Sequence, residues 1–288
     1  MSMLSTEWHV LLVDDEPDVI QVSKLVMADF KVYGQPVRLH VAQSQAEAIE
    51  LLSSNDMFSS TLAVAFIDIV MESDTAGLEL CQYIRETMKN DTTQIFIRTG
   101  QPGVASERDV IDRYDINGYF TKTEATEDKL YSLVKSGVRQ YLSTWNLHGM
   151  LTMLDAFITA GDKRQNLEET LKFLVRGLTV TNQTETDAAT TYVLINGESI
   201  IDDITIDREE AMQLKDSLAK FPSQPLGADG DHYMMDEQNN IIINIVSKPY
   251  QPESFLLIKG APFATPNSIV NLLYMPIKSL ATLWSRAA

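Results

Sequence analysis

The chain has almost no cysteine, no surplus of positive charge and no long apolar run, and each absence excludes a class of protein. Its single cysteine, Cys81, has no partner for an internal disulfide, which favours a reducing compartment. No stretch approaches the roughly 20 apolar residues that a membrane-spanning helix needs. The amino terminus lacks a basic segment followed by an apolar run, so we expect no signal peptide, no membrane association and a cytoplasmic protein.

The net charge of −17 is spread over the whole chain. Residues 1–145 carry 12 basic and 22 acidic side chains, and residues 146–288 carry 11 and 18. Because nucleic acids attract basic surfaces, we expect neither half to bind DNA or RNA. The acidic surplus is typical of a solvated surface.

The first half of the chain alternates between strand-like and helix-like spacing. Its short apolar runs are typical of buried parallel strands, and stretches with helical periodicity separate them. Five such strand–helix units predict a doubly wound α/β sheet with helices on both faces. Functional sites in these sheets lie at the carboxyl ends of the strands. The predicted strands are 8–13, 37–41, 62–67, 94–97 and 118–121.

Acidic side chains follow two of these strands. Asp14 and Asp15 come directly after the first strand, and Asp68 ends the third. Since the two strands are neighbours in a doubly wound sheet, three carboxylates should meet at one edge, where their mutual repulsion favours a bound divalent cation. Oxygen ligands are those that Mg²⁺ prefers. The Asp14–Asp15 pair could also cap a helix starting at Pro17, and the two roles are compatible.

The fourth and fifth strands bring a hydroxyl and an ammonium group to the same edge. Thr99 follows the fourth strand, and Lys122 follows the fifth. A carboxylate nucleophile beside a metal site, a hydroxyl and a lysine suits acceptance of a phosphoryl group, whose charge needs positive partners and hydrogen-bond donors.

These residues resemble the receiver domain of bacterial two-component response regulators, a (βα)5 flavodoxin-like domain, over about residues 8–141. The resemblance implies that Asp68 accepts a phosphoryl group from a sensor histidine kinase or a phosphotransfer protein. Thr99 and Lys122 would contact the phosphoryl group, and Tyr119 would follow the inward movement of Thr99. Such a domain catalyses only its own phosphorylation and dephosphorylation.

The resemblance also implies a metal-binding set. Asp15 would bind Mg²⁺ together with Asp68 and the backbone carbonyl of Val70, and Asp14 would assist through water. A related class, doubly wound hydrolases with an aspartyl nucleophile, typically has a second aspartate two residues after the nucleophile. That position is Val70 here, which argues against hydrolysis of exogenous substrates.

Two loops depart from the receiver pattern. Thr123 follows Lys122 where receivers usually have a proline in a cis bond, and a cis bond without proline is costly. We therefore expect a trans, differently shaped loop. After Asp68 the segment 69–77 replaces the familiar Met-Pro-Gly with a longer, acidic loop.

The second half has no motif as specific as these. Its predicted order of elements resembles a GAF-type α+β domain, with helices on one side of an antiparallel sheet, and nothing in it names a ligand. We expect a receiver domain over 1–141, a GAF-like domain over 142–288, and a helical linker at about 126–160. The predicted helices are 147–157, 167–178, 208–220 and 265 to the end, and the predicted strands are 189–195, 199–206, 233–236, 241–246 and 254–259, with a loop at 223–231.

The loops after Thr99 and Lys122 resemble the corresponding loops of response regulators that carry a receiver, a GAF-like middle domain and an HD-GYP phosphodiesterase of cyclic di-GMP. The chain has no His-Asp dipeptide and no Gly-Tyr-Pro tripeptide, so we expect a fragment of such a regulator rather than a stand-alone protein. One alternative is a small-molecule sensor in which a ligand of the second domain controls the output. The apolar stripe from Leu130 to Phe157 either forms a homodimer or packs on the chain's own domains.

Overall fold

A computed structural model shows two compact units, one formed by Glu7–Trp145 and one formed mainly by residues after Trp145. Each is described separately. No helix in the described ranges is long and apolar enough to cross a membrane. The structure describes residues 7–54, 61–100, 107–160, 190–200, 206–227, 229–246, 253–261 and 266–284.

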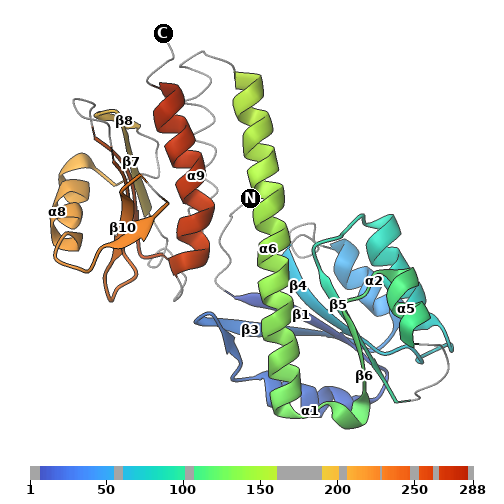
Figure 1. Cartoon of the computed structure of the whole chain (residues 1–288). Helices are drawn as coiled ribbons and strands as arrows, with labels where there is room; N and C mark the ends of the chain where they lie inside the picture. The colour runs from blue at the N-terminus through green and yellow to red at the C-terminus, as the bar shows by residue number, and fades with distance from the viewer. Residues whose placement is uncertain are drawn as a thin grey trace. The chain divides into compact units, whose positions relative to one another are not determined.

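The first unit is built on a sheet with strand order β2-β3-β1-β4-β5-β6 (Figure 1). All neighbouring strands run parallel except the β2–β3 hairpin. This parallel sheet confirms the predicted flavodoxin-like α/β fold. The elements are β1 (Trp8–Val13), α1 (Pro17–Met27), β2 (Lys31–Val32), β3 (Gln35–Ala42), α2 (Gln45–Ser54), β4 (Leu62–Ile67), α4 (Ala76–Gln82) with a π-helical turn (Tyr83–Thr87), β5 (Gln94–Thr99), α5 (Glu107–Tyr114), β6 (Gly118–Thr121), a 3₁₀ turn (Lys122–Glu124) and α6 (Glu127–Ala160).

The central strand β4 is apolar along its whole length because helices cover both of its faces. All six residues of β4 are buried, and Cys81 of α4 is fully buried in the same core. The hairpin between β2 and β3 was not predicted, because two residues are too few for a periodic signal. Its turn places Tyr33 and Gly34 at φ angles of 51° and 81°, the conformation that two-residue hairpins favour.

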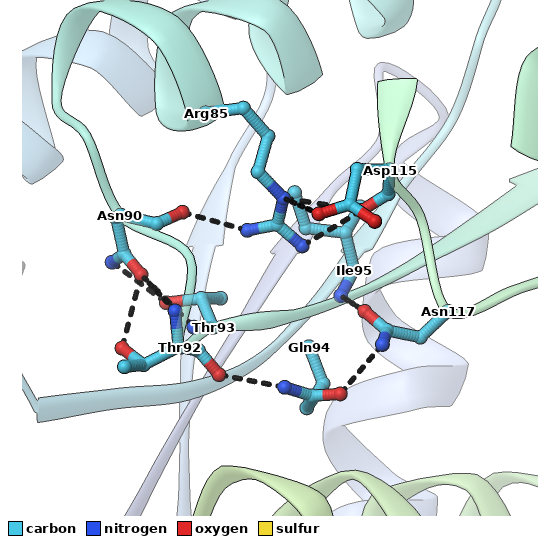
Figure 2. A network of polar contacts seen from close by, with 8 residues as sticks. All are labelled: Arg85, Asn90, Thr92, Thr93, Gln94, Ile95, Asp115 and Asn117. Atoms are coloured by element: carbon cyan, nitrogen blue, oxygen red, sulfur yellow. Dashed lines mark hydrogen bonds and ion pairs between the residues drawn. The ribbon is translucent and has the colours of Figure 1, made fainter. Parts of the chain in front are cut away.

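A polar network holds the amino end of β5, at the edge of the sheet opposite the strand carboxyl ends (Figure 2). Arg85, in the π-helical turn, donates hydrogen bonds from Nε and Nη2 to the carbonyl oxygen of Asp115, at 3.1 and 3.0 Å, and from Nη1 to that of Asn90, at 2.8 Å. Asn117 then accepts from the backbone N–H of Ile95 at 2.8 Å and donates to the Gln94 side chain at 2.6 Å. These bonds join the end of the helix to the starts of β5 and β6.

Replacing Arg85 with methionine should destabilise the first unit by about 2–3 kcal/mol, because the carbonyls of Asn90 and Asp115 would lose three charge-assisted hydrogen bonds. The Arg85 side chain is only 11% exposed. Native-state hydrogen exchange of the β1 and β4 amides would measure the loss. Arg108→Met is the matched control, since Arg108 is 90% exposed and pairs with Asp112 on the surface. Equal losses in the two variants would contradict the role given to Arg85.

The second unit contains an antiparallel sheet with strand order β8-β7-β12-β11-β10-β9. The predicted helix 167–178 lies outside the described residues. The predicted loop 223–231 is wrong in part, because Gln224–Leu226 forms an edge strand, where Pro225 costs no ladder hydrogen bond. The elements are β7 (Thr190–Ile195), β8 (Glu198–Ile200), α8 (Arg208–Leu218), β9 (Gln224–Leu226), β10 (Asp231–Met235), β11 (Ile241–Ile245), β12 (Ser254–Lys259) and α9 (Pro266–Trp284).

The helices α8 and α9 cover opposite faces of this sheet (Figure 1). Tyr192 and Leu257 pack with α8, and alternation along the strands points their neighbours toward α9. On the α9 side, the buried carboxylate of Asp231 accepts a 2.7 Å hydrogen bond from the Tyr274 hydroxyl and pairs with Lys278 at 2.9 Å. The antiparallel sheet was predicted, but the expected arrangement with helices on one side is wrong.

Candidate functional site

The predicted site residues meet at the carboxyl ends of four parallel strands. Asp14 follows β1, Asp68 follows β4, Thr99 ends β5, and Lys122 follows β6. The backbone N–H of Asp68 donates to the carbonyl oxygen of Val13 at 2.9 Å, which holds the end of β4 beside β1. The sheet itself therefore brings together side chains that lie as many as 108 residues apart.

The ammonium group of Lys122 lies among three carboxylates. Its Nζ is 2.6 Å from Oδ2 of Asp68, 2.6 Å from Oε1 of Glu16 and 3.0 Å from Oδ2 of Asp14. We call Asp14, Glu16 and Asp68 the carboxylate cluster. Asp14 and Asp68 are almost fully buried, at 0% and 4% exposure, whereas the Glu16 side chain is 60% exposed. Lys122 supplies the positive charge that such buried carboxylates require.

Burial dominates the ionisation of the cluster. Loss of hydration raises the pKa of Asp68 and of Asp14, and hydrogen bonds from Lys122 only partly oppose this rise. Burial by itself would lower the pKa of Lys122. Its hydrogen bonds to Asp68, Glu16 and Asp14 outweigh that effect and raise the Lys122 pKa. The lysine is therefore a permanent cation, and the two aspartates are held in a site where negative charge is costly.

The carboxylate cluster suits a hard divalent cation. One carboxylate oxygen of each member lies within 4.8 Å of the others. Oδ1 of Asp68 is buried and has no hydrogen-bond partner among the residues that the structure describes, so its lone pairs can accept a ligand. Oxygen donors of this kind match Mg²⁺.

Two of the predicted metal-binding residues, Asp15 and Val70, do not belong to the carboxylate cluster. Asp15 is exposed and is not a member of the carboxylate cluster, and Val70 is half-buried in the loop after Asp68. Glu16 was missed, although it lies two residues after Asp14 in an Asp-Asp-Glu run. That third acidic residue was the available signal.

The loop after Lys122 is a 3₁₀ turn with trans peptide bonds. The Thr121 N–H and hydroxyl donate to Oε2 of Glu124 at 2.8 and 2.9 Å, forming a capping box. The hydrogen bond from the Thr121 backbone lowers the pKa of Glu124. Thr123 thus occupies the usual proline position in a turn that side-chain hydrogen bonds stabilise.

Two hydrogen bonds connect the loop after Asp68 to neighbouring helices. The Gly77 N–H, at the start of α4, donates to the carbonyl oxygen of Ile69 at 3.0 Å. Oε1 of Glu72 accepts a 2.8 Å hydrogen bond from the backbone N–H of Gln45, the first residue of α2. The acidic residues of this longer loop therefore include a cap for a neighbouring helix.

Thr99 and Tyr119 complete the predicted set. Thr99 is buried at the end of β5, where it pairs in register with Thr121 of β6. Tyr119, in β6, is half-buried and packs against the core on the α4 side of the sheet. The movement expected of Thr99 and Tyr119 stays a prediction.

Comparison with known proteins identifies the first unit. The family profile of the response regulator receiver domain matches residues 10–135, and these residues form a receiver domain. A 3'3'-cGAMP-specific phosphodiesterase of Vibrio cholerae is 37% identical over 159 residues, which span 55% of this chain but only 30% of that relative.

Solved structures that match part of this chain have low sequence identity. The signal receiver domain of an HD domain-containing protein from Pseudomonas fluorescens is 17% identical with a TM-score of 0.41, and the alignment covers 50% of this chain and 96% of that one. An adenylate cyclase structure from Rhodopirellula baltica is 18% identical with a TM-score of 0.42, covering 51% and 98% of the two chains.

Proposed function

We propose that the chain is part of a response regulator that accepts a phosphoryl group on Asp68 from a sensor histidine kinase or a phosphotransfer protein. The observation that carries the proposal is the buried Asp68 carboxylate, with Oδ2 bound to Lys122 at 2.6 Å and Oδ1 lacking a described hydrogen-bond partner. A carboxylate oxygen would attack the phosphorus of a phosphohistidine. The P–N bond would break with its electron pair left on the histidine nitrogen, and the new P–O bond would give an acyl phosphate.

The neighbouring residues would share the charge of the transferred group. Lys122 would pair with one phosphoryl oxygen, and the Thr99 hydroxyl would donate to another. The carboxylate cluster would hold Mg²⁺, with Asp15 and the Val70 carbonyl as the further ligands that the family resemblance implies. When bound, the cation would neutralise charge on the phosphoryl oxygens. Tyr119 would follow Thr99 as the switch residue.

Incubation with acetyl phosphate and Mg²⁺ tests the proposal. We expect the intact mass to rise by one phosphoryl group, and hydroxylamine, which cleaves acyl phosphates, to remove the gain. Chelation of the cation with EDTA should prevent the gain, because the carboxylate cluster would then repel the anionic donor. A gain that resists hydroxylamine, or no gain at saturating donor, would contradict the proposal.

We further propose that the state of Asp68 reaches an output domain that acts on a cyclic dinucleotide. The V. cholerae relative, a phosphodiesterase specific for 3'3'-cGAMP, supports this class of output, and the expected HD-GYP output for cyclic di-GMP belongs to the same class. The relay would pass through α6 and the GAF-like second unit. A homodimer through α6 is part of the proposal, supported by Leu147 and Leu151, which are 56% and 55% exposed on one side of that helix.

The sensor alternative rests on a cavity of about 390 Å³ in the second unit. Polar groups from α8 and the sheet line it beside apolar side chains, as is common for small-molecule sites. They include Lys215, His232 and Asn244. A small molecule that co-purifies with the protein and is lost from a Lys215→Ala, His232→Ala double variant would favour this alternative.

A further inference from the structure

A second cation is buried near the carboxylate cluster. Arg98 lies in β5 directly before Thr99 and is only 5% exposed. Its Nη1 donates a 2.8 Å hydrogen bond to the hydroxyl of Ser23 in α1, and that hydroxyl donates to the carbonyl oxygen of Val19 at 2.8 Å. Because side chains alternate along a strand, Arg98 and Thr99 lie on opposite faces of the sheet. The guanidinium is thus held at a fixed place between β5 and α1.

No carboxylate in the described part of the chain forms an ion pair with Arg98, and its Nε has no hydrogen-bond partner there. A buried guanidinium without a direct counter-ion is costly, unless negative charge lies close enough to act through space. Burial lowers the pKa of Arg98, while attraction to Asp14, Asp68 and Glu16 opposes the decrease. In the parallel register of β4 and β5, Ile67 pairs with Ile97, so Asp68 and Arg98 come next on neighbouring strands. The charges that compensate Arg98 are therefore those of the carboxylate cluster.

We propose that Arg98 is a positioning residue that acts as a second fixed positive charge of the phosphoryl-accepting site. This inference rests on the proposed function of Asp68. The carboxylate cluster has three negative charges, and Lys122 offsets one of them. A divalent cation would balance the remainder, but transfer of a phosphoryl group would replace the single negative charge of Asp68 with about two, a net gain of about one negative charge. Arg98 offsets part of that addition without touching the reacting atoms.

A fixed positive charge has opposite effects on the two ions that the site would receive. It weakens attraction for a divalent cation, and it favours an anionic phosphoryl donor. Arg98→Gln, which keeps a donor for Ser23 but removes the charge, should therefore bind Mg²⁺ about fivefold more tightly and accept phosphoryl from acetyl phosphate about tenfold more slowly at saturating Mg²⁺. A purely structural role would weaken both.

The experiment measures Mg²⁺ affinity by calorimetry and phosphoryl transfer by intact mass, using the full chain. Arg98→Lys should restore both values, because it restores the charge. Ser23→Ala is the matched control, since it removes the anchoring hydrogen bond and keeps the guanidinium, and it should change each value less than twofold. Arg98→Met is the second neutral variant if Arg98→Gln does not fold, and thermal unfolding identifies folded variants.

Opposite shifts in the two values, reversed by lysine, would support the proposal. Parallel losses, no change in either value, or failure of lysine to reverse the shifts would overturn it. If the wild-type protein accepts no phosphoryl group, the proposed function fails, while tighter Mg²⁺ binding by Arg98→Gln would still show that Arg98 acts electrostatically on the carboxylate cluster.

Discussion

Asp68→Asn should abolish the mass gain that acetyl phosphate and Mg²⁺ produce, since an amide oxygen cannot replace the carboxylate as the nucleophile. The neighbouring aspartates should not substitute for it. Asp14 has both oxygens close to Lys122, with Oδ1 also accepting from the Glu16 N–H, and Asp15 lies outside the carboxylate cluster. Intact mass spectrometry measures the result. Asp74→Asn, the same chemical change at an exposed position in the loop after Asp68, should leave the gain unchanged.

The same substitution should raise the free energy of unfolding at neutral pH. Burial raises the pKa of folded Asp68 above its unfolded value, so the folded state is increasingly penalised as the pH rises from the unfolded pKa to the raised value, and the penalty is constant above it. Below the ordinary carboxyl pKa of about 4, the wild-type side chain is protonated in both states and the penalty is absent. The advantage of Asp68→Asn should therefore be largest at neutral pH and disappear as the pH falls. Urea unfolding of both proteins across this pH range measures the difference. A variant that is less stable than the wild type at neutral pH would contradict the prediction.

Gly77→Ala should have the second large effect, a loss of about 3 kcal/mol or more from the first unit. A Cβ at Gly77 would lie 1.8 Å from the carbonyl oxygen of Asp68 and 2.9 Å from Cα of Ile69. Both are backbone atoms, so no side-chain rotation relieves the overlap. Either α4 or the loop after Asp68 must move, and phosphoryl acceptance should fall with stability. Hydrogen exchange and intact mass measure the two losses.

Whether Gly77→Ala lowers or raises the stability of the first unit distinguishes steric overlap from helix propensity. Alanine in a helix is ordinarily more stabilising than glycine by about 0.5–1 kcal/mol, so a stabilised variant would contradict the close approach. Gly100→Ala provides a control beside the same site. Its Cβ would meet only the Lys122 side chain among the described residues, at an ordinary contact distance of 3.5 Å.

The site residues that could be predicted from the sequence are those at the carboxyl ends of the parallel strands. Once the apolar runs are recognised as neighbouring strands, their carboxyl ends must share an edge, so Asp14, Asp68, Thr99 and Lys122 had to lie near one another. No side-chain geometry is needed for that step. Burial also made β4 recognisable, because a strand covered on both faces is continuously apolar.

Features that depend on single side chains or very short elements were not predictable in this way. Glu16 joins the carboxylate cluster because the long Lys122 side chain reaches it, and the buried position of Arg98 depends on packing against α1. A polar residue within a strand gives no signal of burial when its partner is 75 residues away. In the second unit, alternating strands predicted the antiparallel sheet, but the faces that helices cover follow from tertiary packing.

The complete burial of Cys81 has a practical consequence for solution work. Its thiol is 0% exposed in the core around α4, and burial raises its pKa to about 12, so almost no reactive thiolate exists in the native state. A maleimide reagent can then reach Cys81 only when this part of the first unit opens, and the rate of labelling reports how often it does. A cysteine added at an exposed position can in turn carry a spectroscopic probe without removal of the native thiol.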